Sequence, residues 1–425
     1  MTLNVRTDRR LIRALHRSSR FVLGEITAPL TTRQNSNDGR LPVNLAFVLD
    51  RSGSMGGDKI RLAKQAVNEA LDRLHPDDRF SVVVYDDHID VVMPTSAATT
   101  EARREALERL ARIEARGSTD LGGGWLRGCE QVALALSEEG VNRCLLLTDG
   151  LANVGMKDPD ELARHADELR ARGVSTSTFG VGADFDERLL QSMASAGGGN
   201  FYYIADAAAI RDHITSEVGE SLDIVARGVV LEVTAPRGVR VEALSPYPTR
   251  QHGGWTEIEI GNLTSDQQLQ VVLRLTFPFG QEGEGQVALL SLADRDAVLQ
   301  ADGKVRWDYA DDAGNDNQDR NREVDRAVAQ IFAARARQQA VQLNRAGDYE
   351  GARLAMAATA KRIKGYAGND VELKKFALDL STEGQEMAAP MPEPSRKVMF
   401  ASSSYVLRSR SLSGEAVKSP RSPKA

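Results

Sequence analysis

Cysteine is nearly absent from this chain of 425 residues, in which only Cys129 and Cys144 occur. Two cysteines exclude a disulfide framework and a zinc RING, and we expect two buried thiols in a reducing compartment rather than a disulfide. No apolar run approaches the roughly 18 residues of a membrane-spanning helix, so no membrane span is predicted. The basic N-terminus lacks the apolar core and cleavage site of a signal peptide, which favours a cytoplasmic protein.

The chain also lacks an excess of positive charge. Its net charge of −6 and pI near 5.7 argue against a nucleic-acid partner, because such binding depends on basic surfaces. No Gly-x-x-x-x-Gly-Lys-Ser/Thr segment occurs, so the glycines at 53–57 and 122–124 do not form a nucleotide-binding loop. With 41% hydrophobic and 27% charged residues, the composition is that of a soluble globular protein of more than one module.

The chain does contain a group of oxygen-bearing side chains directly after a predicted buried strand. Residues 43–49 form an apolar run, and Asp50, Ser52 and Ser54 follow it, with Gly53 permitting a tight turn between the serines. An open α/β sheet places its ligand site at the carboxyl ends of its strands, and a hard divalent cation takes oxygen ligands. On these residues alone, the start of a capped helix is the alternative interpretation.

Two later segments carry further oxygen ligands. Thr119 lies in a loop between an amphipathic stretch at 101–114 and a helical one at 125–137, and Asp149 ends the apolar strand 144–148. This order of elements and motifs resembles the von Willebrand factor type A domain over residues 41–219. The resemblance implies a metal-ion-dependent adhesion site (MIDAS) formed by Asp50, Ser52, Ser54, Thr119 and Asp149. We expect support for the site loops from Gly53, Gly117, Asp120 and Gly150.

The resemblance also implies a function. The expected cofactor is Mg²⁺, with Mn²⁺ and Ca²⁺ as alternatives, and neutral hydroxyls would leave the ion able to take a carboxylate from a protein partner that presents Asp or Glu. We therefore expect a protein–protein interaction module and not an enzyme, since no further carboxylate or histidine is placed beside Asp50 and Asp149. Two alternatives stay open: an adaptor of an AAA-type ATPase, and a structural metal site with no external acidic ligand.

The glycines at 122–124 follow Thr119 closely, and we expect them to make its loop mobile. Trp125 stands next to them and is expected to pack on the sheet rather than to line the rim of the site. Mobility here would matter because the family changes its ligand state through this threonine loop.

The remaining pattern predicts the architecture. Continuous apolar strands alternate with helices up to residue 219, which indicates an α/β fold with a doubly wound, mostly parallel sheet. Beyond 222 the strands alternate with period two, as in an antiparallel β-sandwich, and a strand at 21–26 is expected to join that sandwich, so that the α/β domain is inserted in it. A free N-terminal arm is the alternative. The expected parts are an N-terminal arm or strand (1–40), the α/β domain (41–219), the sandwich (222–308), a C-terminal helical segment (320–384) and a disordered basic Ser/Pro tail (385–425).

Overall fold

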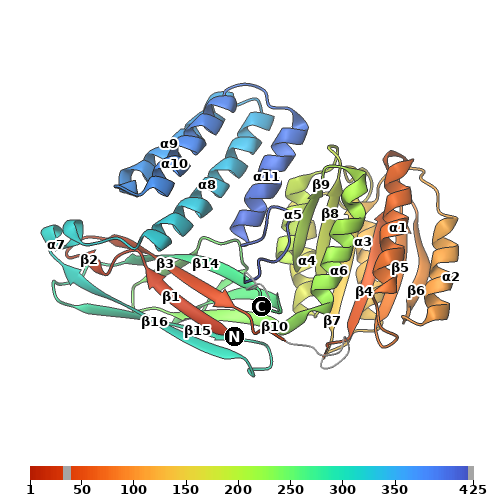
Figure 1. The fold of residues 1–425 in the computed structure, drawn as a ribbon, viewed down its shortest axis with the longest axis horizontal. Helices are drawn as coiled ribbons and strands as arrows, with labels where there is room; N and C mark the ends of the chain where they lie inside the picture. Colours follow the sequence, from red (N-terminus) through yellow and green to blue (C-terminus); the bar gives the residue numbers. More distant parts are fainter. Residues whose placement is uncertain (32–39, 420–425) are drawn as a thin grey trace, which may run out of the picture. The chain divides into compact units, whose positions relative to one another are not determined.

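The computed structural model describes residues 1–31 and 40–419, which divide into two compact units (Figure 1). One unit contains residues 40–224 together with 393–401. The other contains residues 1–31, 225–392 and 402–419. Residues 32–39, part of the predicted N-terminal arm, lie outside the described ranges.

The first unit is built on a six-stranded sheet in the order β6-β5-β4-β7-β8-β9. All neighbouring pairs are parallel except β5 and β6, whose antiparallel pairing makes β6 the predicted hairpin strand at the edge. β4 and β7 are buried along their whole lengths, which explains why their sequences are apolar without alternation. The strands are β4 (Val43–Asp50), β5 (Arg79–Tyr85), β6 (Ile89–Ala97), β7 (Val141–Thr148), β8 (Ser175–Val181) and β9 (Gly198–Ile204).

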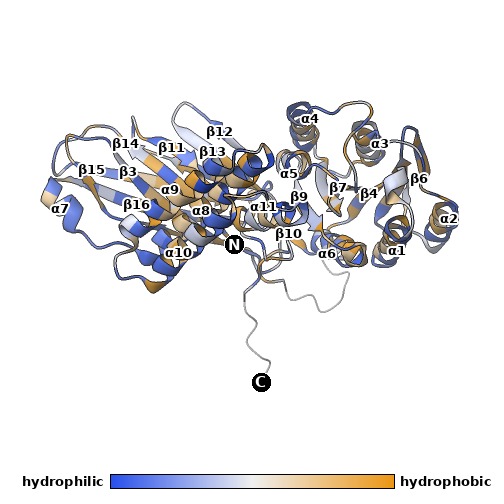
Figure 2. Ribbon diagram, turned by 90° about the horizontal axis from the view of Figure 1, so that it is seen from above, coloured by the Kyte–Doolittle hydropathy of each residue, from blue (hydrophilic) through white to orange (hydrophobic). Residues whose placement is uncertain are grey.

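Helices cover both faces of this sheet (Figure 2). One face packs against α1 (Asp58–Asp72), α2 (Thr100–Ala111) and α6 (Ile210–Leu222). The other packs against α3 (Leu121–Ala133), α4 (Pro159–Ala171) and α5 (Glu187–Ala196). Two short 3-10 turns complete the unit, η1 (Gly53–Met55) and η2 (Ala207–Ala209). The predicted doubly wound α/β fold is confirmed.

The second unit contains a β-sandwich. Its four-stranded sheet has the order β1-β3-β14-β11, and its six-stranded sheet has the order β12-β13-β10-β15-β16-β2. All these neighbours are antiparallel in the registers described, except that β2 runs parallel to β16. The strands are β1 (Thr2–Thr7), β2 (Leu11–Arg13), β3 (Ser18–Thr27), β10 (Ile224–Thr234), β11 (Arg240–Ala243), β12 (Thr249–Gln251), β13 (Trp255–Thr264), β14 (Gln268–Phe277), β15 (Gly285–Ala293) and β16 (Gln300–Ala310).

The N-terminal strand completes this sandwich. β3 pairs with β14 over its full length, from Ser18 opposite Phe277 to Thr27 opposite Gln268. Inward-facing residues of both sheets form one core, in which Trp307 and Phe277 meet edge to face with ring centroids 5.0 Å apart. The chain thus leaves the sandwich after β3 and returns to it at β10, which confirms that the α/β domain is inserted.

The chain after the sandwich is mostly helical, and its longest helix packs on the outer face of the four-stranded sheet. Leu23 and Val272 of that sheet pack against apolar residues of α8. The helices are α7 (Asp312–Asn317), α8 (Arg322–Arg345), α9 (Tyr349–Ala367), α10 (Val371–Glu386) and α11 (Glu393–Leu407). Within residues 1–31 and 40–419, none of the helices combines the length and apolarity needed to cross a membrane.

The prediction of a disordered tail over 385–425 is wrong for most of that segment. Residues 393–407 form α11, in which Phe400, Tyr405 and Leu407 are buried. The chain after α11 runs beside the start of β14, which β11 does not pair with, and there the Val417 carbonyl accepts a hydrogen bond from the Gln268 amide at 2.7 Å. Serine and proline suggested disorder, but the apolar side chains between them are enough to dock the segment. The prediction for 420–425 lies outside the described residues.

Candidate metal centre

The parallel pairing of β4 and β7 brings two buried carboxylates to the same edge of the sheet. Asp50 is the last residue of β4, and Asp149 directly follows β7. Both side chains are buried. Asp50 accepts two hydrogen bonds, one at Oδ1 from the Ser52 amide at 2.7 Å and one at Oδ2 from the Thr148 hydroxyl at 2.6 Å. These bonds fix the orientation of the Asp50 carboxylate.

The two serine hydroxyls lie against these carboxylates. Ser54 Oγ donates a hydrogen bond to Asp149 Oδ1 at 2.6 Å, and Ser52 Oγ lies 3.1 Å from Ser54 Oγ. The turn η1 carries the chain from one serine to the other, as the Asp-x-Ser-x-Ser spacing predicted. Ser52 is buried, whereas Ser54 is exposed, so the group opens to solvent on the Ser54 side.

Thr119 reaches the same place from the loop between α2 and α3. Its carbonyl accepts hydrogen bonds from the amides of Asn153 and Val154, at 3.0 and 3.1 Å. A Cβ atom added at Gly150 would lie 3.5 Å from Ser54 Oγ and 3.7 Å from Thr119 Oγ1, so this glycine sits between the two hydroxyls. The structure therefore gathers all five predicted ligand residues at one edge of the sheet.

The predicted supporting residues have distinct roles. The Gly53 amide donates to the Gly117 carbonyl at 3.2 Å, which joins the serine turn to the threonine loop. Gly117 has φ of +68°, and a Cβ there would meet the Asp87 carboxylate at 2.2 Å, so only glycine fits. Asp120 caps α3 by accepting from the Gly123 amide at 3.0 Å, and its carboxylate is thereby used within the helix start.

The glycines at 122–124 open α3 and do not form the mobile loop that we expected. An added Cβ would lie 2.4 Å from the Tyr85 ring at Gly124 and 3.0 Å from Met156 Cβ at Gly122. Glycine is used here for close helix packing rather than for flexibility. Trp125 is fully buried, with Nε1 3.1 Å from Thr176 Oγ1, so it packs on the sheet as predicted.

Burial raises the pKa of Asp50 from its ordinary value of 3.8 to about 6, and the neighbouring Asp149 carboxylate adds to this rise. Hydrogen bonds from Thr148 and Ser52 oppose the rise but do not cancel it. Two carboxylates held together at a buried sheet edge form a site that a cation would stabilise.

Residues 44–216 match the family model of the von Willebrand factor type A domain. This part of the chain is a von Willebrand factor type A (VWA) domain. Such domains are commonly metal-dependent protein-interaction modules. The match covers the six-stranded sheet and the loops that carry all five candidate ligands.

Curated proteins are similar to this chain over part of their lengths. The uncharacterized protein YfbK of Escherichia coli (strain K12) is 28% identical over 280 residues, which are 63% of this chain and 48% of YfbK. Inter-alpha-trypsin inhibitor heavy chain H4 of Bos taurus is 29% identical over 191 residues, 43% of this chain and 21% of that protein. The chain thus spans about half of YfbK and about a fifth of the heavy chain.

Solved structures extend the likeness beyond the VWA domain. The von Willebrand factor type A protein from Catenulispora acidiphila has a TM-score of 0.70 at 21% identity, covering 93% of this chain and 88% of that one. The ArnB paralog VWA2 from Sulfolobus acidocaldarius has a TM-score of 0.56 at 17% identity, covering 91% and 97%. At these identities the likeness concerns the fold.

Sequence reasoning missed a cation beside the VWA site. Lys59, the second residue of α1, directs its ammonium to Asp149 Oδ2, and the same nitrogen lies 3.3 Å from the Ser54 carbonyl oxygen. Its side chain is 29% exposed. In the sequence, Lys59 stands only five residues after Ser54, which could have indicated that it lies near the site. Its contact with Asp149, however, depends on how the Gly56–Gly57 segment leads into the helix.

A second missed feature is a group of arginines beneath the loops of the VWA domain. Arg51, buried between the ligand residues Asp50 and Ser52, contacts Asp86 at 3.1 Å and Asp90 at 2.5 Å. Arg116 contacts Asp86 at 2.8 Å from the threonine loop. Burial alone would raise the pKa of Asp86, but hydrogen bonds from Arg116, the His88 amide and Arg51 hold it below its ordinary value. These ion pairs tie three site loops together.

Asp86, Asp87 and His88 also place potential ligand atoms within 4.8 Å of one another. The Asp86 carboxylate is already engaged by Arg51 and Arg116, and Asp87 and His88 are exposed. We therefore assign this group to loop structure rather than to a second metal site.

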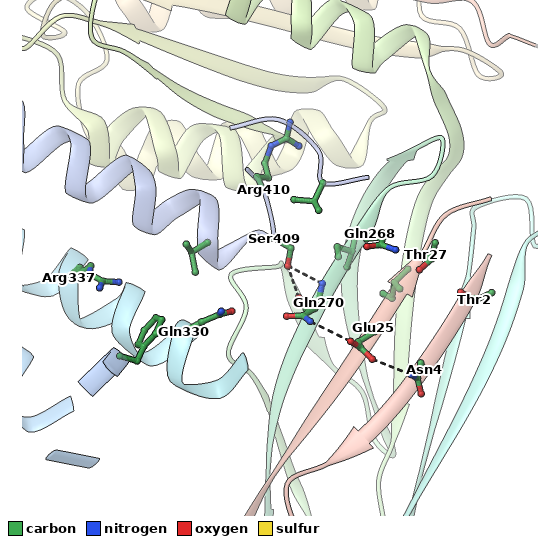
Figure 3. A pocket seen from close by; sticks show the side chains of 15 residues that line it. Thr2, Asn4, Glu25, Thr27, Gln268, Gln270, Gln330, Arg337, Ser409 and Arg410 are labelled. Carbon is green, nitrogen blue, oxygen red and sulfur yellow. Dashed lines mark hydrogen bonds between the residues drawn. The ribbon is translucent and has the colours of Figure 1, made fainter. Parts of the chain in front are cut away.

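A cavity of about 680 Å³ lies in the sandwich unit, between the outer face of β1, β3 and β14 and the C-terminal helices (Figure 3). Its charged groups are already paired. Glu25 accepts from Asn4 at 3.1 Å and Gln270 at 3.5 Å, Arg337 contacts Glu383 at 2.6 Å, and Arg410 donates to the Gly414 carbonyl. These contacts hold the charged lining residues within the fold, and we assign no ligand to this cavity.

Proposed function

We propose that the VWA domain binds a divalent cation, Mg²⁺ in the first instance, and through it captures a carboxylate side chain of a protein partner. The observation that carries the proposal is the convergence of Ser52, Ser54 and Asp149, with contacts of 3.1 and 2.6 Å between their oxygens. Asp50 and Thr119 stand beside them at the same edge of the sheet.

The donor set fits such an ion. Adjacent ligands of an octahedral Mg²⁺ lie about 2.9 Å apart, because each is about 2.0–2.1 Å from the metal. The Ser52 Oγ–Ser54 Oγ distance of 3.1 Å is slightly longer than that value, and the Ser54 Oγ–Asp149 Oδ1 distance of 2.6 Å is slightly shorter. Both Asp50 oxygens already accept hydrogen bonds, so Asp50 would hold water beside the ion rather than ligate it directly. Mn²⁺ and Ca²⁺ also prefer oxygen donors and are included in the test.

The exposed position of Ser54 supports a binding role rather than catalysis. Neutral hydroxyls in the inner shell leave the positive charge of the ion largely uncompensated, and the open side faces solvent where a partner can approach. A bound cation would supply a strong charge-assisted contact to an incoming carboxylate. The proposed module is therefore a non-enzymatic scaffold, and its two free, buried thiols fit a reducing cytoplasmic compartment.

Calorimetric titration with Mg²⁺, Mn²⁺ and Ca²⁺ tests the cation. Ser54→Ala and Thr119→Ala should each weaken Mg²⁺ binding at least about tenfold, because each removes one hydroxyl from the site. Ser96→Ala is the matched control, since that serine lies on β6 and donates to the Pro94 carbonyl. Equal affinities in all four proteins would refute the proposed ligand set.

Capture from lysate with and without EDTA tests the partner. Proteins retained by wild type in Mg²⁺ should be lost with EDTA and with Ser54→Ala, and mass spectrometry should recover the same set in both comparisons. If Ser54→Ala loses Mg²⁺ and thermal stability but retains its partners, the ion has a structural role and the capture proposal is wrong.

A further inference from the structure

We infer that Lys59 tunes two affinities of the candidate centre in opposite directions. Its ammonium lowers the affinity of the centre for the cation and raises the affinity of the bound cation for an acidic ligand. This inference rests on the proposed function and adds a specificity-determining residue to it. None of the five expected ligands is Lys59, and its contact with Asp149 follows only from the fold.

The two oxygens of Asp149 have different partners. Oδ1 accepts a hydrogen bond from Ser54 at 2.6 Å and faces the serine hydroxyls, whereas Oδ2 contacts the Lys59 ammonium. Asp149 is fully buried, so its charge is compensated by neighbouring groups more than by solvent. A cation at the serines would share this carboxylate with a lysine that is already in place.

A count of formal charges gives the consequence. Asp50, Asp149 and Lys59 sum to −1, so a divalent ion brings the centre to +1 and an incoming carboxylate brings it to zero. Without the ammonium, the carboxylates sum to −2, the ion alone neutralises them, and an added carboxylate leaves −1. Lys59 therefore opposes the metal and favours the acidic ligand.

The other nearby charges do not alter this difference. Arg51 and Arg116 are engaged by Asp86, and Asp58 pairs with Arg61 at 2.7 Å on the exposed start of α1. Because Lys59 is partly exposed, solvent screens its charge, and we expect an effect of about five- to tenfold on each affinity rather than several orders of magnitude.

The test compares Lys59→Met, which keeps the aliphatic stem, with Lys59→Arg, which keeps the charge. Arg61→Gln is the matched control, since it removes one positive charge from the same turn of α1 without contacting the site. Titration calorimetry on the full chain gives the Mg²⁺ affinity. Acetate is the carboxylate probe, and its binding to Mn²⁺-loaded protein is followed by paramagnetic relaxation of its methyl protons.

We expect Lys59→Met to bind Mg²⁺ about five- to tenfold more tightly and acetate about five- to tenfold more weakly than wild type, with Lys59→Arg and Arg61→Gln close to wild type. Opposite movement of the two affinities is a result that a packing role would not produce. If Lys59→Met changes neither affinity, or lowers both together, the inference is wrong while the metal site stands. If wild type and Lys59→Met both bind no cation at millimolar concentration, the proposed function fails and this inference fails with it.

Discussion

Lys397 offers the most direct test of how the VWA domain is completed by residues far along the chain. It lies in the first half of α11, in the part assigned to the same unit as the VWA domain, and its side chain is 1% exposed. The ammonium donates to the Phe185 carbonyl at 2.5 Å and to Glu187 Oε2 at 2.9 Å, and it lies 4.0 Å from the centre of the Phe185 ring.

The expected cost of Lys397→Met follows from these contacts. Methionine keeps most of the aliphatic stem and its packing, so the change mainly removes the charge. Taking one partner from a buried ion pair costs about 3–5 kcal/mol, because the remaining charge loses its compensation in a poorly solvated place. Here Glu187, itself 1% exposed, loses its ammonium partner. We expect the contact between α11 and the start of α5 to weaken by that amount.

Hydrogen exchange measured by mass spectrometry is the suitable assay, since a chain of two units does not unfold in a single two-state step. Amides of 393–401 and 187–196 should exchange about 10²- to 10⁴-fold faster in Lys397→Met, while exposed Lys375→Met serves as control. Adding Glu187→Gln to Lys397→Met should recover part of the protection, because it removes the uncompensated charge. Unchanged protection in the single variant would refute the assignment of these residues to the VWA unit.

Three further predictions concern the Asp50 carboxylate, the packing of α3 and the C-terminal segment. The rise in Tm on adding Mg²⁺ should be full above about pH 6 and should shrink below it. The pKa of Asp50 in the fold is raised to about 6, so the cation-free protein gains stability by binding a proton as the pH falls. The cation needs the ionised carboxylate, so its binding competes with that proton. Gly124→Ala should destabilise the VWA domain by about 1–3 kcal/mol in thermal unfolding, because the added Cβ would overlap the Tyr85 ring. Gly365→Ala in α9 is the control: a Cβ there has no neighbour within 4 Å, so this change should be neutral or stabilising. A chain ending at residue 392 should have a lower Tm than the full chain, because it lacks α11 and the strand-edge contacts of 409–418, and an unchanged Tm would show that this segment is not docked.

The sequence predicted the VWA fold well because its local signals agree with one another. Apolar runs without alternation mark strands buried on both faces, and β4, β5 and β7 lie where those runs stand. The candidate ligands could be predicted for a related reason. Asp50 and Asp149 each stand at the end of such a run, and adjacent parallel strands bring those ends together.

The missed features depend on contacts that sequence spacing does not encode. Arg51 sits inside the ligand motif, yet its partners Asp86 and Asp90 come from another hairpin, and only the fold brings them within reach. Three glycines in a row at 122–124 predict flexibility, but the close approach of Tyr85 to α3 accounts for Gly124. The composition of the tail predicts disorder, whereas its burial depends on a few apolar residues at helical spacing and on Lys397.

These missed residues explain how hydroxyls carried by loops can form a prearranged site. A loop that opens to solvent gains little rigidity from packing, and fixing its backbone costs about 1–2 kcal/mol per residue in entropy. Here the buried Asp86 carboxylate pairs with buried Arg51 of the serine turn and with exposed Arg116 of the threonine loop, and the Gly53–Gly117 backbone bond joins the same two segments. The ordering is therefore supplied by ion pairs beside the site, and the oxygens of Ser52, Ser54 and Thr119 are not used in those ion pairs. Arg51→Met should accordingly loosen both loops and weaken Mg²⁺ binding although no ligand is changed, and an unaltered affinity in that variant would show that the loops are ordered by other contacts.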